Sequence, residues 1–74
     1  MTALIFENFA SPAYAVHTYP LYGCWHIERR ADQATTLMMT GTEGLEAYRA
    51  LKAAWRKSRA HFDALCSTFA FEPD

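Results

Sequence analysis

The pattern of hydrophobic and polar positions changes at Gly41. Before this residue the apolar positions alternate or form short runs, which is typical of half-buried β-strands. After it they recur at steps of three, four or seven residues, the spacing of one face of an α-helix. The helical positions are Leu45, Tyr48, Leu51, Trp55, Phe62, Leu65 and Phe69. This predicts an α+β fold, with a β-rich meander over residues 1–41 and one long C-terminal amphipathic helix over residues 42–71 packed against it.

Turn signals divide the first half of the chain into segments with β patterning. Leu4–Phe6 predicts a short first strand or arm that ends before Ser11-Pro12, because proline lacks the N–H that a β-ladder needs. Residues 14–19, 24–30 and 35–40 predict three further strands. We therefore expect an antiparallel sheet of three strands, or of four if the first segment pairs at its edge.

The predicted helix is longer than the predicted strands. A helix over residues 42–70 would be about 43 Å long, whereas strands of six or seven residues reach about 20–23 Å. Either the helix breaks near Lys57-Ser58-Arg59 and folds back, or its C-terminal part packs on another chain. Because no glycine or proline lies in this region to favour a break, the second alternative is preferred, and it predicts a homodimer through the C-terminal part of the helix.

The composition indicates one globular domain over residues 1–74. A hydrophobic content of 51% with 20% charged residues is far from that of a disordered chain. Domains of this size bury only about 60% of their unfolded surface, so stability is marginal without a disulfide, a metal or a partner chain.

The two cysteines, Cys24 and Cys66, are too few for the disulfide frameworks of small secreted domains. The N-terminal residues lack the pattern of a signal peptide, and no stretch approaches the roughly 18 apolar residues that would span a bilayer. We expect a soluble protein of the cytoplasm, or of the host cytoplasm if it is phage-encoded, without membrane contact. Free thiols are expected, and a single bridge between the two cysteines is the alternative.

Motifs for catalysis or metal binding are weak. Cys24 and His26 share one strand face and His17 could lie opposite, but the spacing matches no zinc motif. A thiol–imidazole pair can be written from the same residues, yet a small sheet with one helix offers little concavity for a substrate. We predict no catalytic site, no metal site and no cofactor.

The clearest candidate for a binding surface is a basic stripe on the predicted helix. Its residues lie within about 80° of one another on a helical wheel; they are Arg49, Lys52, Arg56 and Arg59. Such a stripe suits an acidic protein surface or a phosphate backbone, although amphipathic helices commonly present charge to solvent. We expect adjoining contacts from Tyr19, Tyr22, Arg29 and Arg30.

These features favour a non-enzymatic domain that binds a protein partner. The net charge of −1 does not indicate a general attraction to nucleic acid. By analogy, small domains of this shape are frequent among phage and mobile-element proteins that inhibit a host defence system, anti-CRISPR proteins included. The alternative is a small dimeric nucleic-acid-binding or regulatory module that uses the same basic face.

Overall fold

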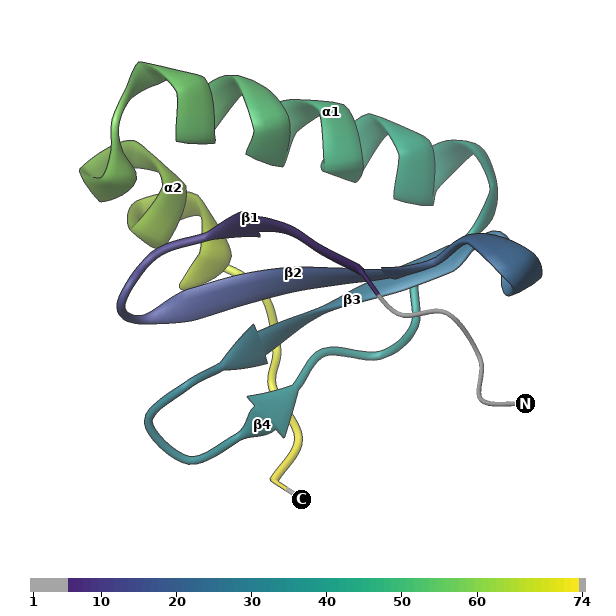
Figure 1. Ribbon diagram of the computed structural model, residues 1–74, viewed down its shortest axis with the longest axis horizontal. Coiled ribbons are helices and arrows are strands. Elements are labelled where there is room, and N and C mark those ends of the chain that lie inside the picture. Colours follow the sequence, from purple (N-terminus) through teal and green to yellow (C-terminus); the bar gives the residue numbers. More distant parts are fainter. Residues whose placement is uncertain (1–5, 74) are drawn as a thin grey trace.

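The chain folds as an α+β domain in the computed structural model, which describes residues 6–73 and the side chains from Phe9 onward. Within this range the sheet has four antiparallel strands in the order β1-β2-β3-β4, and two helices pack against one of its faces (Figure 1). The elements are β1 (Phe6–Ala10), β2 (Tyr14–Tyr19), a 3-10 turn η1 (Pro20–Tyr22), β3 (Cys24–Arg29), β4 (Ala34–Thr35), α1 (Gly41–Lys57) and α2 (Arg59–Cys66).

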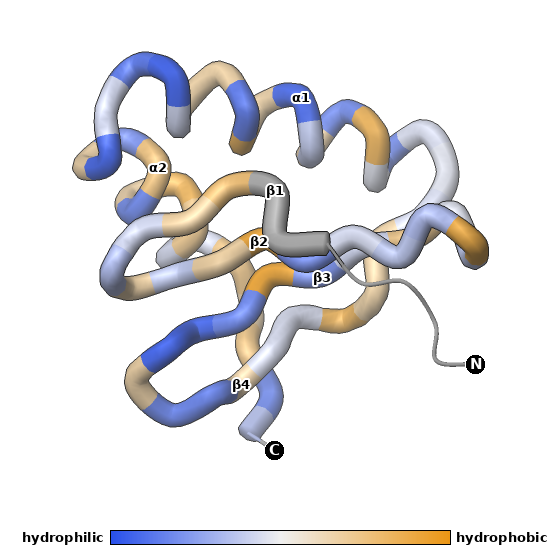
Figure 2. The backbone as a smooth tube through the Cα atoms, in the orientation of Figure 1, coloured by the Kyte–Doolittle hydropathy of each residue, from blue (hydrophilic) through white to orange (hydrophobic). Residues whose placement is uncertain are grey.

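The central strands β2 and β3 have the predicted alternation. Val16 lies opposite Ile27 in the register, and both side chains are fully buried beneath the helices. His17 lies opposite His26 on the other face of the sheet, where both side chains are half-buried. The alternation in β3 is visible as hydrophobic positions beside hydrophilic ones in Figure 2. The polar and apolar positions of these strands therefore fix which face receives the helices.

The outer strands differ from the prediction. Leu4 and Ile5 lie outside the described residues, and β1 runs from Phe6 to Ala10 with an irregularity between Glu7 and Phe9. The last strand, predicted over residues 35–40, is limited to Ala34–Thr35.

Strand β4 ends where a side chain replaces one main-chain acceptor of the ladder. The hydroxyl of Thr36 accepts a hydrogen bond from the Ile27 N–H at 3.0 Å. The Thr36 N–H still donates to the Ile27 carbonyl oxygen at 2.9 Å. The chain then leaves the sheet over Leu37 and Met38, which are exposed, and returns at Met39 to form a bridge with Trp25. The predicted strand is thus interrupted at Leu37 and Met38, where the chain leaves the sheet and both apolar side chains face solvent.

The predicted single long helix is wrong in detail, because it is broken at Ser58 into α1 and α2. Ser58 has an extended backbone, and its hydroxyl accepts a hydrogen bond from the His61 N–H at 3.1 Å. Serine is a favoured residue at this N-cap position, so no glycine or proline is needed for the break. The 17 residues of α1 span about 25 Å, which matches strands of about 20 Å.

The segment expected to project from the sheet is instead part of the core. Phe62 and Cys66 of α2 are fully buried within this chain, and Leu65, Phe69 and Phe71 pack against the same core. The reason for expecting a homodimer through this segment is therefore removed.

The C-terminal residues also join the sheet. Glu72 pairs with Thr35 through two main-chain hydrogen bonds of 2.8 and 3.1 Å, and this covers the outer edge of β4. Edge strands with unpaired main-chain groups are prone to aggregate, so this pairing protects the edge.

The core lies between the sheet and the two helices. Its buried side chains are Phe9, Val16, Trp25, Ile27, Leu51, Phe62 and Cys66. Aromatic rings connect the layers: the Tyr48 ring centroid lies 5.3 Å from that of Phe9 and 5.6 Å from that of Trp25. Trp55 of α1 also donates a hydrogen bond from Nε1 to the Ala10 carbonyl oxygen at 3.0 Å. These rings hold α1 in a defined position over the sheet.

Candidate functional site

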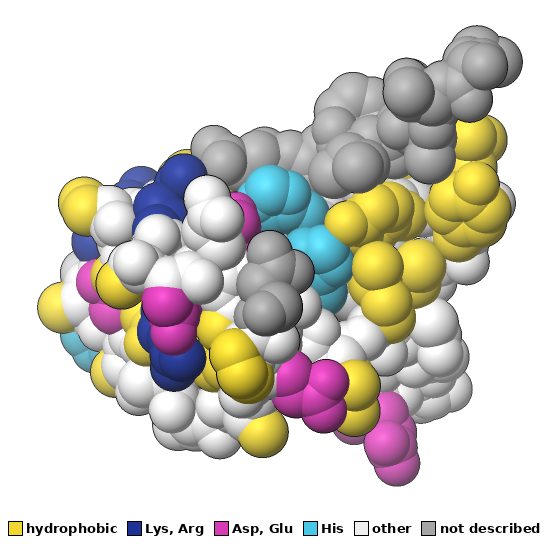
Figure 3. Space-filling model, turned by 90° about the horizontal axis from the view of Figure 1, so that it is seen from below, with side chains coloured by type: hydrophobic (Ala, Val, Ile, Leu, Met, Phe, Trp, Pro, Cys, Tyr) yellow, Lys and Arg dark blue, Asp and Glu magenta, His cyan; other side chains and the backbone are white. Residues whose placement is uncertain are grey.

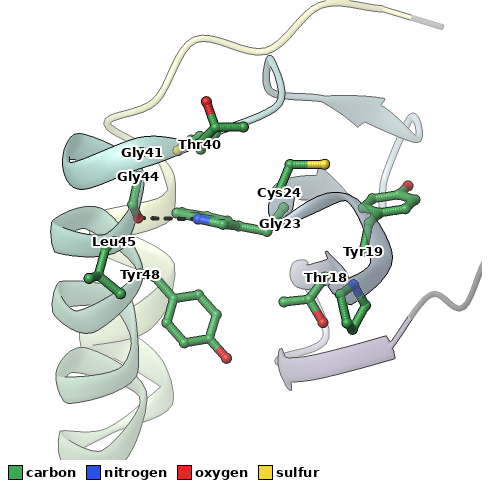
Figure 4. A pocket seen from close by; sticks show the side chains of 12 residues that line it. Thr18, Tyr19, Gly23, Cys24, Thr40, Gly41, Gly44, Leu45 and Tyr48 are labelled. Carbon is green, nitrogen blue, oxygen red and sulfur yellow. Dashed lines mark hydrogen bonds between the residues drawn. The ribbon is translucent and has the colours of Figure 1, made fainter.

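An open pocket of about 500 Å³ lies between the turn after β2 and the start of α1 (Figure 4). Tyr48 of α1 and Thr18 of β2 lie on opposite sides of it, whereas the Tyr19 ring points away from α1, towards His26. The residues that line it are mostly apolar or aromatic: Thr18, Tyr19, Pro20, Gly23, Cys24, Trp25, Met39, Thr40, Gly41, Gly44, Leu45 and Tyr48. A concave apolar surface with few polar groups is typical of a binding site for an apolar group.

The wall of this pocket is fixed by contacts between β3 and α1. The indole Nε1 of Trp25 donates a hydrogen bond to the carbonyl oxygen of Gly44 at 3.1 Å (Figure 4). Gly44 also packs closely against Met39, since a Cβ atom at this position would lie only 3.1 Å from the main-chain carbon of Met39. This wall of the pocket is therefore built by close packing of the two segments.

Exposed apolar side chains lie at the pocket (Leu45) and on the two segments that contribute to its wall, η1 and the segment between β4 and α1. Among the described residues, the exposed large apolar side chains are Leu21 (66%), Tyr22 (67%), Leu37 (70%), Met38 (50%) and Leu45 (47%). We call these five residues, together with the pocket, the apolar surface. Figure 2 shows the turn η1 as a hydrophobic tip at the right, and Figure 3 shows hydrophobic side chains gathered at the same end.

The hollows beside Leu37 and Met38 share lining residues with the pocket. Met38 and Leu37 line two further hollows, one of which shares Met39, Thr40 and Gly44 with the pocket. The other shares Met39 with both. Contiguous exposed apolar patches on small soluble domains usually mark binding sites.

The opposite face of the sheet carries a histidine pair, which is visible as two adjacent histidines in Figure 3. The rings of His17 and His26 stack with centroids 5.4 Å apart. His17 Nε2 lies 3.3 Å from a Glu28 oxygen, within ion-pair distance but without hydrogen-bond alignment. Burial, and secondarily the neighbouring His17, lower the pKa of His26. In the part of the chain that the structure describes, no group of three metal-ligating side chains converges.

The two cysteines are free and have different environments. Cys24 is half-buried at the pocket, whereas Cys66 is fully buried in the core on the helix side of the sheet. Burial raises the pKa of the Cys66 thiol to about 12, with a smaller contribution from Asp63. Cys66 is therefore a structural, protonated thiol, and Cys24 is the accessible one.

The basic stripe is divided by the helix break. Arg49, Lys52 and Arg56 line one open hollow of about 430 Å³ with Ala53, which we call the basic groove. Arg59 belongs to α2, where its guanidinium lies 3.8 Å above the Trp55 ring and donates to the Trp55 carbonyl oxygen. The structure thus brings together three of the four predicted cations.

The other predicted contact residues lie at opposite ends of the β2–β3 hairpin. Tyr19 and Tyr22 lie at the apolar surface, the first half-buried and the second exposed. Arg29 is paired with Asp32 at 2.8 Å, and its guanidinium lies 5.0 Å from the Phe71 ring centroid. Arg30 donates to the Ser11 carbonyl oxygen at 3.0 Å. The two arginines are therefore engaged within the fold, away from the two tyrosines.

Sequence reasoning missed Leu21, Leu37, Met38 and Leu45 as surface residues. The sequence pattern predicts Leu37 and Met38 within a strand and Leu45 on the core face of the helix. A usable signal was present in Leu21-Tyr22, since large apolar residues in a predicted turn have no neighbouring element to cover them.

Comparison with known proteins adds no relationship. No protein-family model matches the chain, and no match is found among curated proteins or solved structures. The helices in the described part of the chain are too short or too polar to cross a membrane.

Proposed function

We propose that this chain is a non-enzymatic protein-interaction domain that binds a partner protein through the apolar surface. The observation that supports this is an apolar pocket lined by the exposed Leu45, with four more large exposed apolar side chains on the segments that contribute to its wall. Leaving such side chains in water is unfavourable by about 1.5–3 kcal/mol for each that a partner could fully bury. A surface of this kind is stabilised when a partner covers it.

The pocket suits an apolar anchor from the partner. Binding energy in protein interfaces concentrates in a few large side chains that enter well-packed pockets, with tyrosine among the commonest contributors. Tyr22 and Leu21 stand on η1 beside the pocket, and Leu45 stands at its α1 wall. We assign these three residues the main part of the binding energy.

The narrower role expected from the sequence stays a prediction within this proposal. An inhibitor from a phage or other mobile element, of the anti-CRISPR type, acts by covering a functional surface of a host defence protein. Such a mechanism needs a binding surface and no reacting group, so the proposed surface is compatible with it. The partner in that case is a bacterial defence protein.

The proposal is tested by affinity capture from a bacterial lysate with and without nuclease. The double variant Leu21→Ser/Tyr22→Ser removes the exposed tip of η1, and Ala60→Ser/Ala64→Ser is its matched control on exposed positions of α2. We expect a stoichiometric protein with the wild type and the control, but not with the η1 variant. Capture that nuclease abolishes would support the nucleic-acid alternative, and equal capture by both variants would contradict the proposal.

A further inference from the structure

The apolar surface continues into the basic groove along one stripe of α1. Leu45, Arg49, Lys52 and Arg56 are all exposed and follow one another at spacings of four, three and four residues. Residues at these spacings are neighbours on a helix surface. The stripe therefore begins with an apolar side chain at the pocket and continues with three cations over about 16 Å.

The cations of this stripe have no ion-pair partner among the described residues. Among the described residues, ion pairs join His17 to Glu28 and Arg29 to Asp32, and neither pair involves the groove. The acidic residues of α1, Glu43 and Glu46, lie in its first turns and do not line the groove. Ala53 lies among the cations and adds little bulk. The groove thus presents an uncompensated positive charge on a surface that another helix can approach closely.

We infer that the partner segment which covers the stripe is an acidic amphipathic α-helix, a deepening that rests on the proposed function. A second helix lying along α1 has the same rise per residue, so carboxylates spaced by four and three residues match the three cations. An apolar residue one turn before the first carboxylate then lies at Leu45 and the pocket. The charge complementarity and the regular spacing favour a helix over an irregular acidic loop.

The magnitudes assign different roles to the two parts. Exposed ion pairs contribute weakly, so three of them change affinity by about tenfold. The basic groove therefore orients the partner helix and speeds its association, while the apolar contacts hold it. A duplex nucleic acid offers phosphates for the groove but no apolar group for the adjoining pocket.

The test uses two hydrocarbon-stapled helical peptides of identical composition and a mixed-sequence DNA duplex. One peptide carries leucine and three glutamates on one face at the spacing of the stripe, and the other has the same residues dispersed around the helix. We expect the patterned peptide to bind the wild-type protein about tenfold more tightly in fluorescence anisotropy at low salt.

Charge reversal separates the groove from the rest of the molecule. The variant Arg49→Glu/Lys52→Glu/Arg56→Glu is expected to lose the preference for the patterned peptide. Lys57→Glu, an exposed position on the same helix outside the groove, is expected to retain it. Circular dichroism of both variants shows whether the helices are intact.

Other outcomes overturn the inference. Equal binding of the two peptides would contradict the inference that the partner segment is an acidic amphipathic helix. Tighter binding of the duplex, with log affinity falling by about 0.9 per phosphate contacted for each log unit of salt, would assign the groove to nucleic acid. In a third outcome, a captured partner binds the charge-reversed protein as tightly as the wild type and fails to bind Leu21→Ser/Tyr22→Ser. That result would show that the basic groove does not contact the partner, and it would still support the proposed function.

Discussion

Trp25 of β3 donates a hydrogen bond from its indole Nε1 to the carbonyl oxygen of Gly44, in the first turn of α1, at 3.1 Å. Both residues are buried, and both line the pocket at the apolar surface. The bond joins the sheet to the helix at the place where the chain leaves Met39 and enters α1. The shape of the proposed binding site and the packing of the core thus depend on the same contact.

Removing this bond should destabilise the domain. Trp25→Phe keeps an aromatic ring but deletes the donor, and we expect the free energy of unfolding to fall by about 1–3 kcal/mol. The measurement is urea denaturation followed by circular dichroism. Trp55→Phe is the matched comparison, because its donor bonds Ala10 at a less buried position, and its loss should be smaller. An unchanged midpoint for Trp25→Phe would contradict the role given to this bond.

Substitution of Phe62 tests whether α2 belongs to the core of this chain or forms an interface with a second copy. Because the Phe62 side chain is fully buried within the chain, Phe62→Ala should cost about 3–5 kcal/mol. For a domain this small, such a loss leaves little or no folded protein. The check combines urea denaturation with analytical ultracentrifugation. A folded variant that merely changes from dimer to monomer would show that this segment is an interface after all.

The two thiols should differ in reactivity. Cys24 is half-buried at the pocket, whereas Cys66 is fully buried and its pKa is raised to about 12, so Cys66 holds its proton at neutral pH. We expect iodoacetamide at pH 8 to add one group to the native protein, at Cys24, and two to the protein in urea. Mass spectrometry of tryptic peptides locates the adducts. Rapid modification of Cys66 in the native state would contradict its burial.

Acid should weaken the fold through His26. Its pKa is lowered in the native state, first by burial and then by His17, so below the ordinary value near 6.5 the unfolded chain binds more protons. Stability from this group is therefore present above pH 6.5 and is lost as the pH falls through the lowered native pKa. Among the described residues, His17, Glu28 and Tyr19 act on or contact His26.

The measurement is the urea midpoint between pH 7.5 and pH 5. We expect a fall for the wild type and a smaller fall for His26→Gln, which cannot gain the proton. An identical pH dependence in the two proteins would assign the acid sensitivity to other groups.

The strand pairing could be predicted because it depends on local pattern. In β3 the apolar Trp25 and Ile27 alternate with polar positions, which places them on one face without knowledge of the rest. In β2 the pattern is weaker, because Ala15 and Val16 are adjacent and both buried. The break at Ser58 could not be chosen over a dimer, because one serine is a weak signal beside a continuous helical pattern. The break is favoured because it lets Phe62 be buried in the core against residues of the sheet, which are distant in the sequence.

The candidate site was only partly predictable for a related reason. The grouping of Arg49, Lys52 and Arg56 follows from helical spacing alone, and the structure retains it. Arg59 lies beyond the break, so its geometry depended on an event that the spacing does not encode. The exposure of Leu37 and Met38 depends on the Thr36 hydroxyl, which interrupts the strand through one side-chain hydrogen bond.

The most direct test of the central claim is the affinity of the purified captured partner for the wild type, for Leu21→Ser/Tyr22→Ser and for Ala60→Ser/Ala64→Ser, measured by calorimetry. Truncating residues at the centre of an interface typically costs 2 kcal/mol or more, so the η1 variant should bind about thirtyfold more weakly or worse. The control should match the wild type. Equal dissociation constants for all three proteins would show that the apolar surface is not where the partner binds.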